Sequence, residues 1–195
     1  MTNTPSEYYS RNTWLNSKSI ISETSNGLSS SYELVTLDGK QFDLSLKGID
    51  PFIYSVHDGL IAYSTERGVQ YFTDRKNPEI FIAKVDQSGS VEEIASFILD
   101  DFATLSTTLE IRGFSRDNSY FAFFINLNDG SKERYLKVMD IRDNTFFTIQ
   151  FPNTDADLSI KPIRFFWIDE NTLLMTTESS TSDETRISTW TYSIN

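Results

Sequence analysis

The chain of 195 residues has no cysteine, only five prolines and eight glycines, and a single histidine. The absence of cysteine excludes disulfides, thiolate metal ligands and a cysteine nucleophile, and it fits a reducing compartment. No hydrophobic run approaches the roughly 18 residues of a membrane-spanning helix. Residues 1–10 are polar and lack the basic and apolar regions of a signal peptide. We therefore expect a soluble, cytoplasmic protein with no membrane partner.

Basic residues are also scarce. Seventeen Lys and Arg stand against 28 Asp and Glu, so the formal net charge is −11 and the sequence pI is about 4.5. This charge would repel a phosphate backbone, and the basic residues form no cluster, so we expect no nucleic-acid partner. We interpret the acidity mainly as a solubilising surface, which would also suit a basic protein partner or a cation.

Aromatic residues, in contrast, are abundant: 15 Phe, 9 Tyr and 3 Trp. They are enriched in strands and bury large areas. The segment from Phe114 to Ile149 shows the arrangement most clearly. It holds three aromatic and β-branched runs separated by polar turns, and one of these turns is Asp143-Asn144. Asp and Asn tolerate the positive φ angles of hairpin turns, so this segment is predicted to be an antiparallel meander.

The same pattern recurs along the chain. In four places an aromatic residue is followed by a polar turn and by an apolar strand that starts six residues later. These aromatic residues are Trp14, Tyr54, Phe114 and Trp167. Second and third strands follow, except that the fourth copy ends without its third. The predicted repeats cover about residues 8–47, 48–107, 108–152 and 153–195.

Four strands per repeat at this spacing are typical of propeller blades. The expected fold is therefore all-β: one domain over 1–195 with a β-propeller-like array of about four antiparallel, four-stranded blades. Because an open edge is a liability, the incomplete last blade would be filled by another strand. The candidates are Glu7–Arg11 or a second copy of the chain, which would make a homo-oligomer.

One segment departs from this pattern. Ser90 and Glu93 form a capping-box pattern, and the apolar residues that follow fall at helical spacing up to Leu105. We expect a helical insertion near 90–105. A third strand over Glu92–Phe97, followed by a loop, is the alternative.

The stretch Phe114-Ser115-Arg116-Asp117-Asn118, followed by the apolar residues 120–123, resembles the TolB-like, WD40-like β-propeller repeat. Arg116 stands where that pattern has Pro, and Asn118 where it has Gly. Residues 167–174 are similar to a variant found in propellers of prolyl-oligopeptidase-type enzymes. The resemblance implies a propeller fold in which Asp117 fixes a hairpin. It implies no particular activity, and the chain has no room for a hydrolase domain.

Residues that could carry chemistry are few. His57 lies in a predicted turn beside Asp58, and no Gly-x-Ser-x-Gly elbow accompanies it. In residues 153–159, side chains that carry oxygen atoms stand at every second position, as at the start of a calcium loop. Leu158 and Arg164, however, stand where such a loop needs Gly and Glu. The adjacent carboxylates are interpreted as solvated turns: Asp100-Asp101, Asp169-Glu170 and Asp183-Glu184. No catalytic, cofactor-binding or metal-ligating residue is assigned, and no cofactor is expected.

The three tryptophans, Trp14, Trp167 and Trp190, are assigned to blade cores, with a ligand-binding face as the alternative for one of them. The polar segments 126–131 and 179–184 are predicted to be exposed hairpin tips, where propellers form binding faces.

Two functions remain open on this basis. The first is a non-catalytic protein-interaction or scaffold module on a small acidic β-propeller, whose protein partner would have a basic surface. The alternative is an enzyme that binds a small ligand, a carbohydrate or a cation through carboxylates at the propeller channel.

Overall fold

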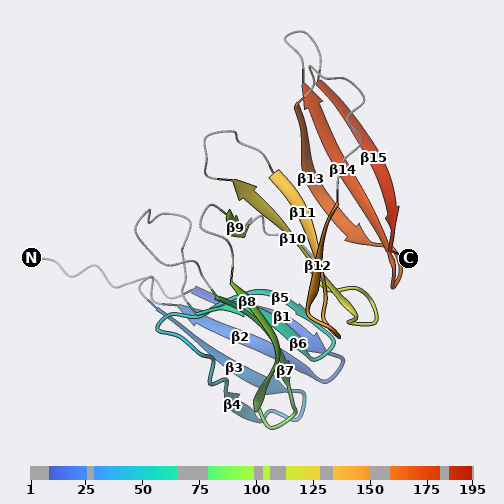
Figure 1. Cartoon of the computed structure of the whole chain (residues 1–195). Coiled ribbons are helices and arrows are strands. Elements are labelled where there is room, and N and C mark those ends of the chain that lie inside the picture. The colour runs from blue at the N-terminus through green and yellow to red at the C-terminus, as the bar shows by residue number, and fades with distance from the viewer. Residues whose placement is uncertain are drawn as a thin grey trace, which may run out of the picture. The chain divides into compact units, whose positions relative to one another are not determined.

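A computed structural model describes residues 9–25, 29–65, 79–98, 103–105, 113–127, 134–149, 159–180 and 185–194. Its strands form four antiparallel sheets, and in each sheet strands that are consecutive in sequence are neighbours (Figure 1). The chain divides into two compact units, residues 1–98 and 99–195, with two sheets in each. The all-β prediction is confirmed. No helix within the described ranges has the length and apolar character needed to cross a membrane.

The first unit contains two four-stranded sheets. The first sheet consists of β1 (Tyr9–Asn16), β2 (Ser19–Ser25), β3 (Ser30–Thr36) and β4 (Gln41–Asp43). The second sheet consists of β5 (Phe52–His57), β6 (Leu60–Ser64), β7 (Glu79–Val85) and β8 (Val91–Ile98). Alternate side chains of the two sheets meet in one buried cluster, which includes Leu15 and Leu34 from the first sheet and Tyr63 and Phe81 from the second.

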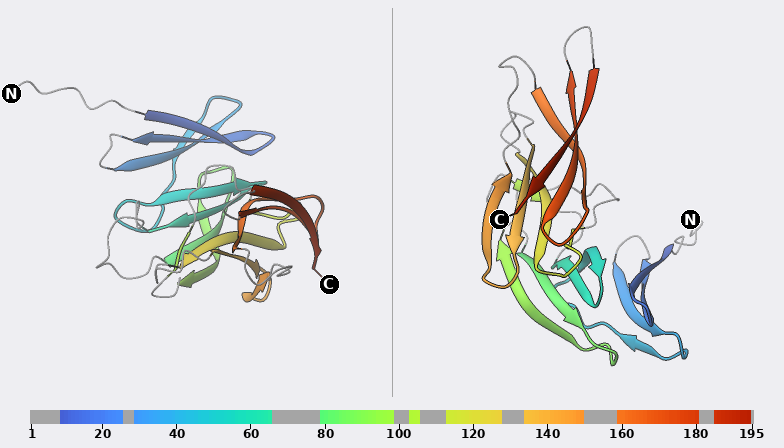
Figure 2. Two further views of the ribbon diagram at one scale, coloured as in Figure 1. Left: turned by 90° about the horizontal axis from the view of Figure 1, so that it is seen from above. Right: turned by 90° about the vertical axis from the view of Figure 1, so that its right-hand side faces the viewer.

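The second unit contains a four-stranded and a three-stranded sheet. The third sheet consists of β9 (Ala103–Leu105), β10 (Tyr120–Leu127), β11 (Arg134–Asp140) and β12 (Thr145–Ile149). The fourth sheet consists of β13 (Ser159–Trp167), β14 (Thr172–Ser180) and β15 (Thr185–Ser193), and its strands twist strongly (Figure 2). Phe124 of β10 and Phe165 of β13 pack edge to face, with ring centroids 5.2 Å apart, at the centre of the shared core.

The predicted turn chemistry is present at the hairpins. Asp58, Asn118 and Asn144 are the described non-glycine residues with positive φ, at 38°, 63° and 58°. Asp58 is followed by Gly59 at φ 86°, so the pair closes the two-residue connection between β5 and β6. These local choices place the strands where the sequence pattern predicts them.

The helix expected near 90–105 is wrong for Val91–Ile98, which is strand β8 paired with β7. The ladder joins Ala95 to Ile82 and Glu93 to Ala83, so Ile94 is an extra residue in a β-bulge. An extra residue breaks the period-two alternation, which is why the spacing imitates a helix. The alternative strand over Glu92–Phe97 matches the structure, and residues 99–102 lie outside the described ranges.

Two further details concern the ends of the sheets. Residues 106–112, which lead up to Phe114, lie outside the described ranges, and β9 pairs with β10 at the edge of the third sheet. Phe114 itself makes an isolated bridge to Phe121. Within the segment Glu7–Arg11, the described residues begin β1 and pair with β2. The described part of this segment therefore belongs to the first sheet.

Two glycines with positive φ offer a matched test of this fold. A Cβ built on Gly48 (φ +114°) would lie 2.0 Å from the carbonyl oxygen of Thr65, whereas one built on Gly39 (φ +83°) would meet nothing within 4 Å. We expect Gly39→Ala to cost about 1–2 kcal/mol of unfolding free energy through backbone strain alone. Gly48→Ala should cost roughly 2 kcal/mol more, because the backbone must also move. Urea unfolding of both variants measures the difference, and equal losses would contradict the described contact.

Candidate interaction surface

The last strand of the fourth sheet, β15, is an edge strand with regular pairing on one side. All nine residues of β15 pair with β14, from Thr185 opposite Ser180 to Ser193 opposite Thr172, without a bulge. Within the described residues, β14 is the only strand that pairs with β15, so β15 forms an edge of its sheet (Figure 1). The backbone N–H and C=O groups on the outer side of such a strand form a template for another strand.

The side chains of β15 leave this edge accessible. Eight of its nine residues are uncharged, and Arg186 is the exception. Ile187 is 66% exposed and Tyr192 is 36% exposed. In the turn before β14, Ile168 is 53% exposed. From Arg186 to Ser193, the outer side of β15 pairs with no other described strand and carries apolar side chains, which a second strand could cover.

The other strands at sheet edges carry the features by which proteins protect such edges. Strands β4 and β9 have three residues each, and β12 has five. Bulges interrupt the pairing of β1, β5, β8 and β13, and β13 also contains Pro162. Strand β8 carries the adjacent carboxylates Glu92 and Glu93. Of the described edges, β15 alone combines length and regular pairing with a nearly uncharged sequence.

The inner side of β15 is held by the core of the second unit. Trp190 packs against the buried cluster, and its indole Nε1–H donates to Thr177 Oγ1 at 2.9 Å. Thr177 is only 2% exposed, so this bond is part of the interior.

A surface hollow of about 310 Å³ lies at one end of the first sheet. It is lined by the residues around the β3–β4 turn, including Leu37 and Phe42, and by Lys18 and Gln87. Its one carboxylate is Asp38, which accepts a hydrogen bond from the hydroxyl of Thr36 and pairs with Lys40. These contacts lower the pKa of Asp38 to about 2, with the Lys40 hydrogen bond as the main cause. The described lining of the hollow thus lacks the pair of carboxylates that glycoside hydrolysis requires.

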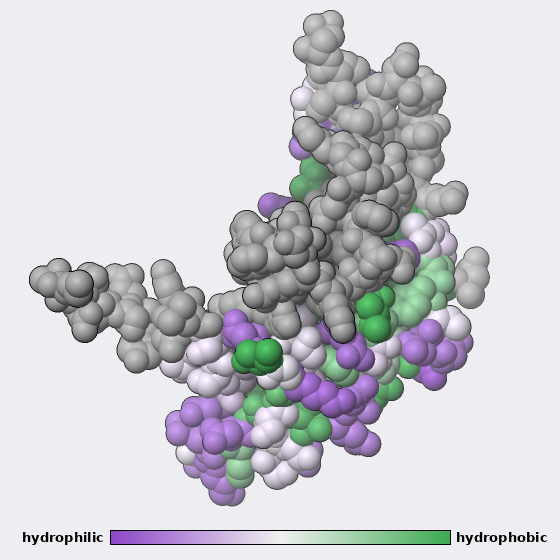
Figure 3. Space-filling view, turned by 60° about the vertical axis from the view of Figure 1, so that its left-hand side comes forward, coloured by the Kyte–Doolittle hydropathy of each residue, from purple (hydrophilic) through white to green (hydrophobic). Residues whose placement is uncertain are grey.

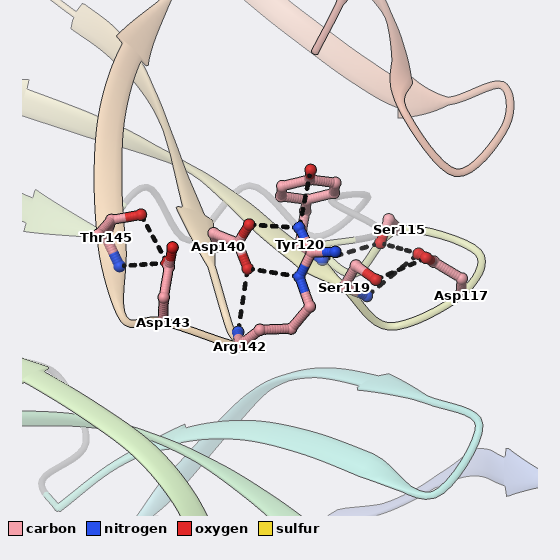
Figure 4. A network of polar contacts seen from close by, with 8 residues as sticks. All are labelled: Ser115, Asp117, Ser119, Tyr120, Asp140, Arg142, Asp143 and Thr145. Atoms are coloured by element: carbon pink, nitrogen blue, oxygen red, sulfur yellow. Dashed lines mark hydrogen bonds and ion pairs between the residues drawn. The ribbon is translucent and has the colours of Figure 1, made fainter. Parts of the chain in front are cut away.

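The acidic residues at strand ends serve the turns. Asp117 accepts hydrogen bonds from the N–H of Ser119 at 3.1 Å and from the hydroxyl of Ser115 at 2.8 Å (Figure 4). Asp140 accepts from the guanidinium and the backbone N–H of Arg142, and the Arg142 hydrogen bond is the main cause of its lowered pKa. The guanidinium also donates to Tyr120 Oη at 3.1 Å. This network fixes the loops of the motif that the sequence singled out.

The remaining sequence candidates do not form a site among the described residues. His57 is the last residue of β5, next to the Asp58-Gly59 turn. Asp169 and Glu170 are exposed, and Asp169 accepts the N–H of Asn171 at 2.9 Å. The pairs Asp100-Asp101 and Asp183-Glu184, and residues 153–158 of the calcium-like loop, lie outside the described ranges. No group of three or more His, Asp or Glu that could hold a metal occurs in the ranges described.

Two of the three tryptophans pack in a core. Trp167 stacks on Tyr120 with ring centroids 5.9 Å apart and donates to the carbonyl of Gly113, while Trp190 packs in the same cluster. The assignment of Trp14 to a core is wrong, because this residue is 62% exposed. A bulge between Trp14 and Asn16 turns Leu15 inward in its place. The described parts of the predicted tips, in β10 and β14, are strand residues.

Neither a protein-family model nor any curated protein sequence matches this chain. The function is therefore argued from the geometry of the chain itself. That geometry points to the β15 edge, which the sequence pattern indicates only through the three strands of its fourth repeat.

Removing the buried hydroxyl of the turn network should destabilise the second unit. Ser115 is fully buried, and its Oγ accepts the N–H of Tyr120 at 2.9 Å. Ser115→Ala leaves that N–H without its partner, so we expect a loss of about 1–3 kcal/mol. Ser119→Ala is the control, because its hydroxyl donates to Asp117 in a solvent-exposed hydrogen bond, so this variant should cost less than about 1 kcal/mol. If chemical unfolding showed an equal loss of free energy for Ser119→Ala and Ser115→Ala, the buried hydrogen bond would contribute no more stability than the exposed one.

Acid should weaken the turns through their carboxylates. The hydroxyl of Ser88, followed by the N–H groups of Ser90 and Ser88, holds the pKa of Asp86 below its ordinary 3.8. A lowered folded-state pKa gives stability that is present above pH 3.8 and is lost as the pH falls through the folded value. Asp86→Asn keeps an acceptor oxygen but does not titrate, so its melting temperature should fall less steeply below pH 4 than that of the wild type. An unchanged acid slope would contradict this role for Asp86, and Asp86→Ala, which removes the acceptor, should also melt earlier at pH 7.

Proposed function

We propose that this chain is a non-catalytic protein-interaction module with a β-propeller-like arrangement of its sheets, and that it binds an extended segment of a polypeptide along β15. Each sheet would be one blade. The resemblance of residues 114–123 to TolB-like, WD40-like repeats supports this view. So do the meander order of all four sheets and their face-to-face packing in consecutive pairs.

The observation that carries the proposal is the β15 edge. Strand addition to an exposed edge is a common mode of peptide recognition, in which backbone hydrogen bonds supply affinity and alternate side chains supply specificity. On the face shown in Figure 3, the coloured residues form small hydrophobic areas between hydrophilic ones.

The charge of the chain contributes to the choice of partner. With a net charge of −11, the protein attracts a basic surface at long range and repels an acidic one. A heterologous partner would therefore carry a basic surface around the strand that it adds. Such steering changes the association rate and weakens as salt is added.

The carboxylate-based enzyme has less support. A general acid needs a raised pKa at neutral pH. Every described Asp with a shifted pKa has it lowered: Asp38, Asp86, Asp117, Asp140 and Asp169. Hydrogen bonds within the turns keep these carboxylates ionised, which suits structure better than proton transfer.

A selection from displayed random nine-residue peptides tests the proposal without a known partner. We expect it to enrich peptides in which β-branched or aromatic residues alternate with polar ones, as strands require. Enrichment of nothing, or of peptides without this alternation, would contradict the proposal.

Two proline variants then locate the binding site. Successive N–H groups point to opposite sides of a strand, so of Ser188 and Thr189 one directs its N–H outward. One of the two variants Ser188→Pro and Thr189→Pro removes the outward N–H. That variant should fold normally but bind the selected peptides at least about tenfold more weakly, as measured by Kd. The other should lower the melting temperature, because it breaks the ladder to β14. Peptides that bind equally well to the folded proline variant must occupy another surface.

A further inference from the structure

We infer that the strand that β15 takes is the β15 of a second copy of this chain, in an antiparallel pair around a two-fold axis at Thr189. The inference rests on the proposed function, because it names the partner of the same edge. Thr189 is the midpoint of the nine-residue strand Thr185–Ser193. A two-fold axis at this position therefore pairs the whole strand with its copy, and the interface uses the same surface on both chains.

The register is self-complementary in size. Thr189 lies opposite its own copy, and Thr–Thr pairs are favourable across strands. Ser188 lies opposite Trp190 of the copy, and Ile187 opposite Thr191. Trp190 and Ile187 thus each face a small side chain, so Trp190, which the core already holds, meets no bulky neighbour.

The register is also complementary in charge. Arg186, the one charged residue of β15, lies opposite Tyr192 of the copy, where its guanidinium can contact an aromatic face. No like charges face one another across the pair. The pair extends the three-stranded sheet of each copy into a six-stranded sheet and covers an edge that has no protective feature of its own.

The net charge of the chain predicts how this dimer should respond to salt. Two copies of charge −11 repel one another at long range, whereas the contact strands carry little charge. Salt screens the repulsion, with a Debye length of about 8 Å at 0.15 M. Self-association should therefore strengthen as salt rises from low values, whereas binding to a basic partner should weaken.

Light scattering and sedimentation on the full chain test the inference. We expect a concentration-dependent species of twice the 22.4 kDa chain mass, whose share rises with added salt. Thr189→Lys and Thr189→Glu each place two like charges directly opposite one another. Each variant should raise the dimer Kd about tenfold or more.

An equal mixture of the Thr189→Lys and Thr189→Glu proteins should restore the dimer, because opposite charges then meet on the axis. Thr148→Glu, an exposed change on the edge strand β12 that faces Lys137 across the ladder, is the matched control and should dimerise like the wild type. Melting curves of all variants verify that they are folded. Rescue by mixing cannot come from misfolded chains.

Three outcomes would overturn the inference. The first is a wild type that stays monomeric at all soluble concentrations and salt levels. The second is a dimer that neither Thr189 variant weakens, because its contact must lie elsewhere. The third is a Lys and Glu mixture that stays monomeric. If the wild type is monomeric but the displayed peptides bind β15, the second-copy inference fails while the proposed function stands; if neither occurs, both fail.

Discussion

The sheets of this protein depend on one short-range interaction, in which a side-chain oxygen accepts the backbone N–H of the residue two positions later. It occurs six times, at five described turns, where the acceptors are Asn16, Asp86, Asp117, Asp140, Asp143 and Asp169. The bond satisfies an N–H that the ladder cannot use and bends the chain back toward its neighbour. With only eight glycines in the chain, these Asp and Asn side chains supply much of the turn geometry.

Because these carboxylates stabilise turns, the acidic composition is not in itself evidence for a binding or catalytic site. An excess of Asp and Glu first suggests a charged binding face or a catalytic pair. Several of these groups instead accept local hydrogen bonds, which keep them ionised and positioned for the backbone. The features that remain for recognition are exposed backbone edges and scattered apolar side chains. Among the described edges, β15 is long, regular and nearly uncharged, so it is where another chain gains the most hydrogen bonds for the least desolvation of charge.

The errors of sequence reasoning share a cause. At Val91–Ile98 and at Trp14 the local pattern is sound, but a bulge alters it. Ile94 adds a residue to β8 and produces apolar spacing like that of a helix, whereas the pairing with β7 requires a strand. In β1, a bulge next to Trp14 turns Leu15 into the core and leaves the larger ring exposed. Bulges depend on the partner strand, so a single-sequence pattern does not reveal them.

The sequence by itself determined the all-β class, the division into four strand groups, the positions of most turns and the three strands of the last group. These properties are local: period-two apolar runs select strands, and Asp, Asn and Gly at fixed offsets select tight turns. The tertiary structure decided which aromatic residues are buried, whether residues 91–98 form a helix or a strand, and which edge stays unprotected. Those properties depend on the register between strands and on the packing between sheets, which join residues that are far apart in the chain.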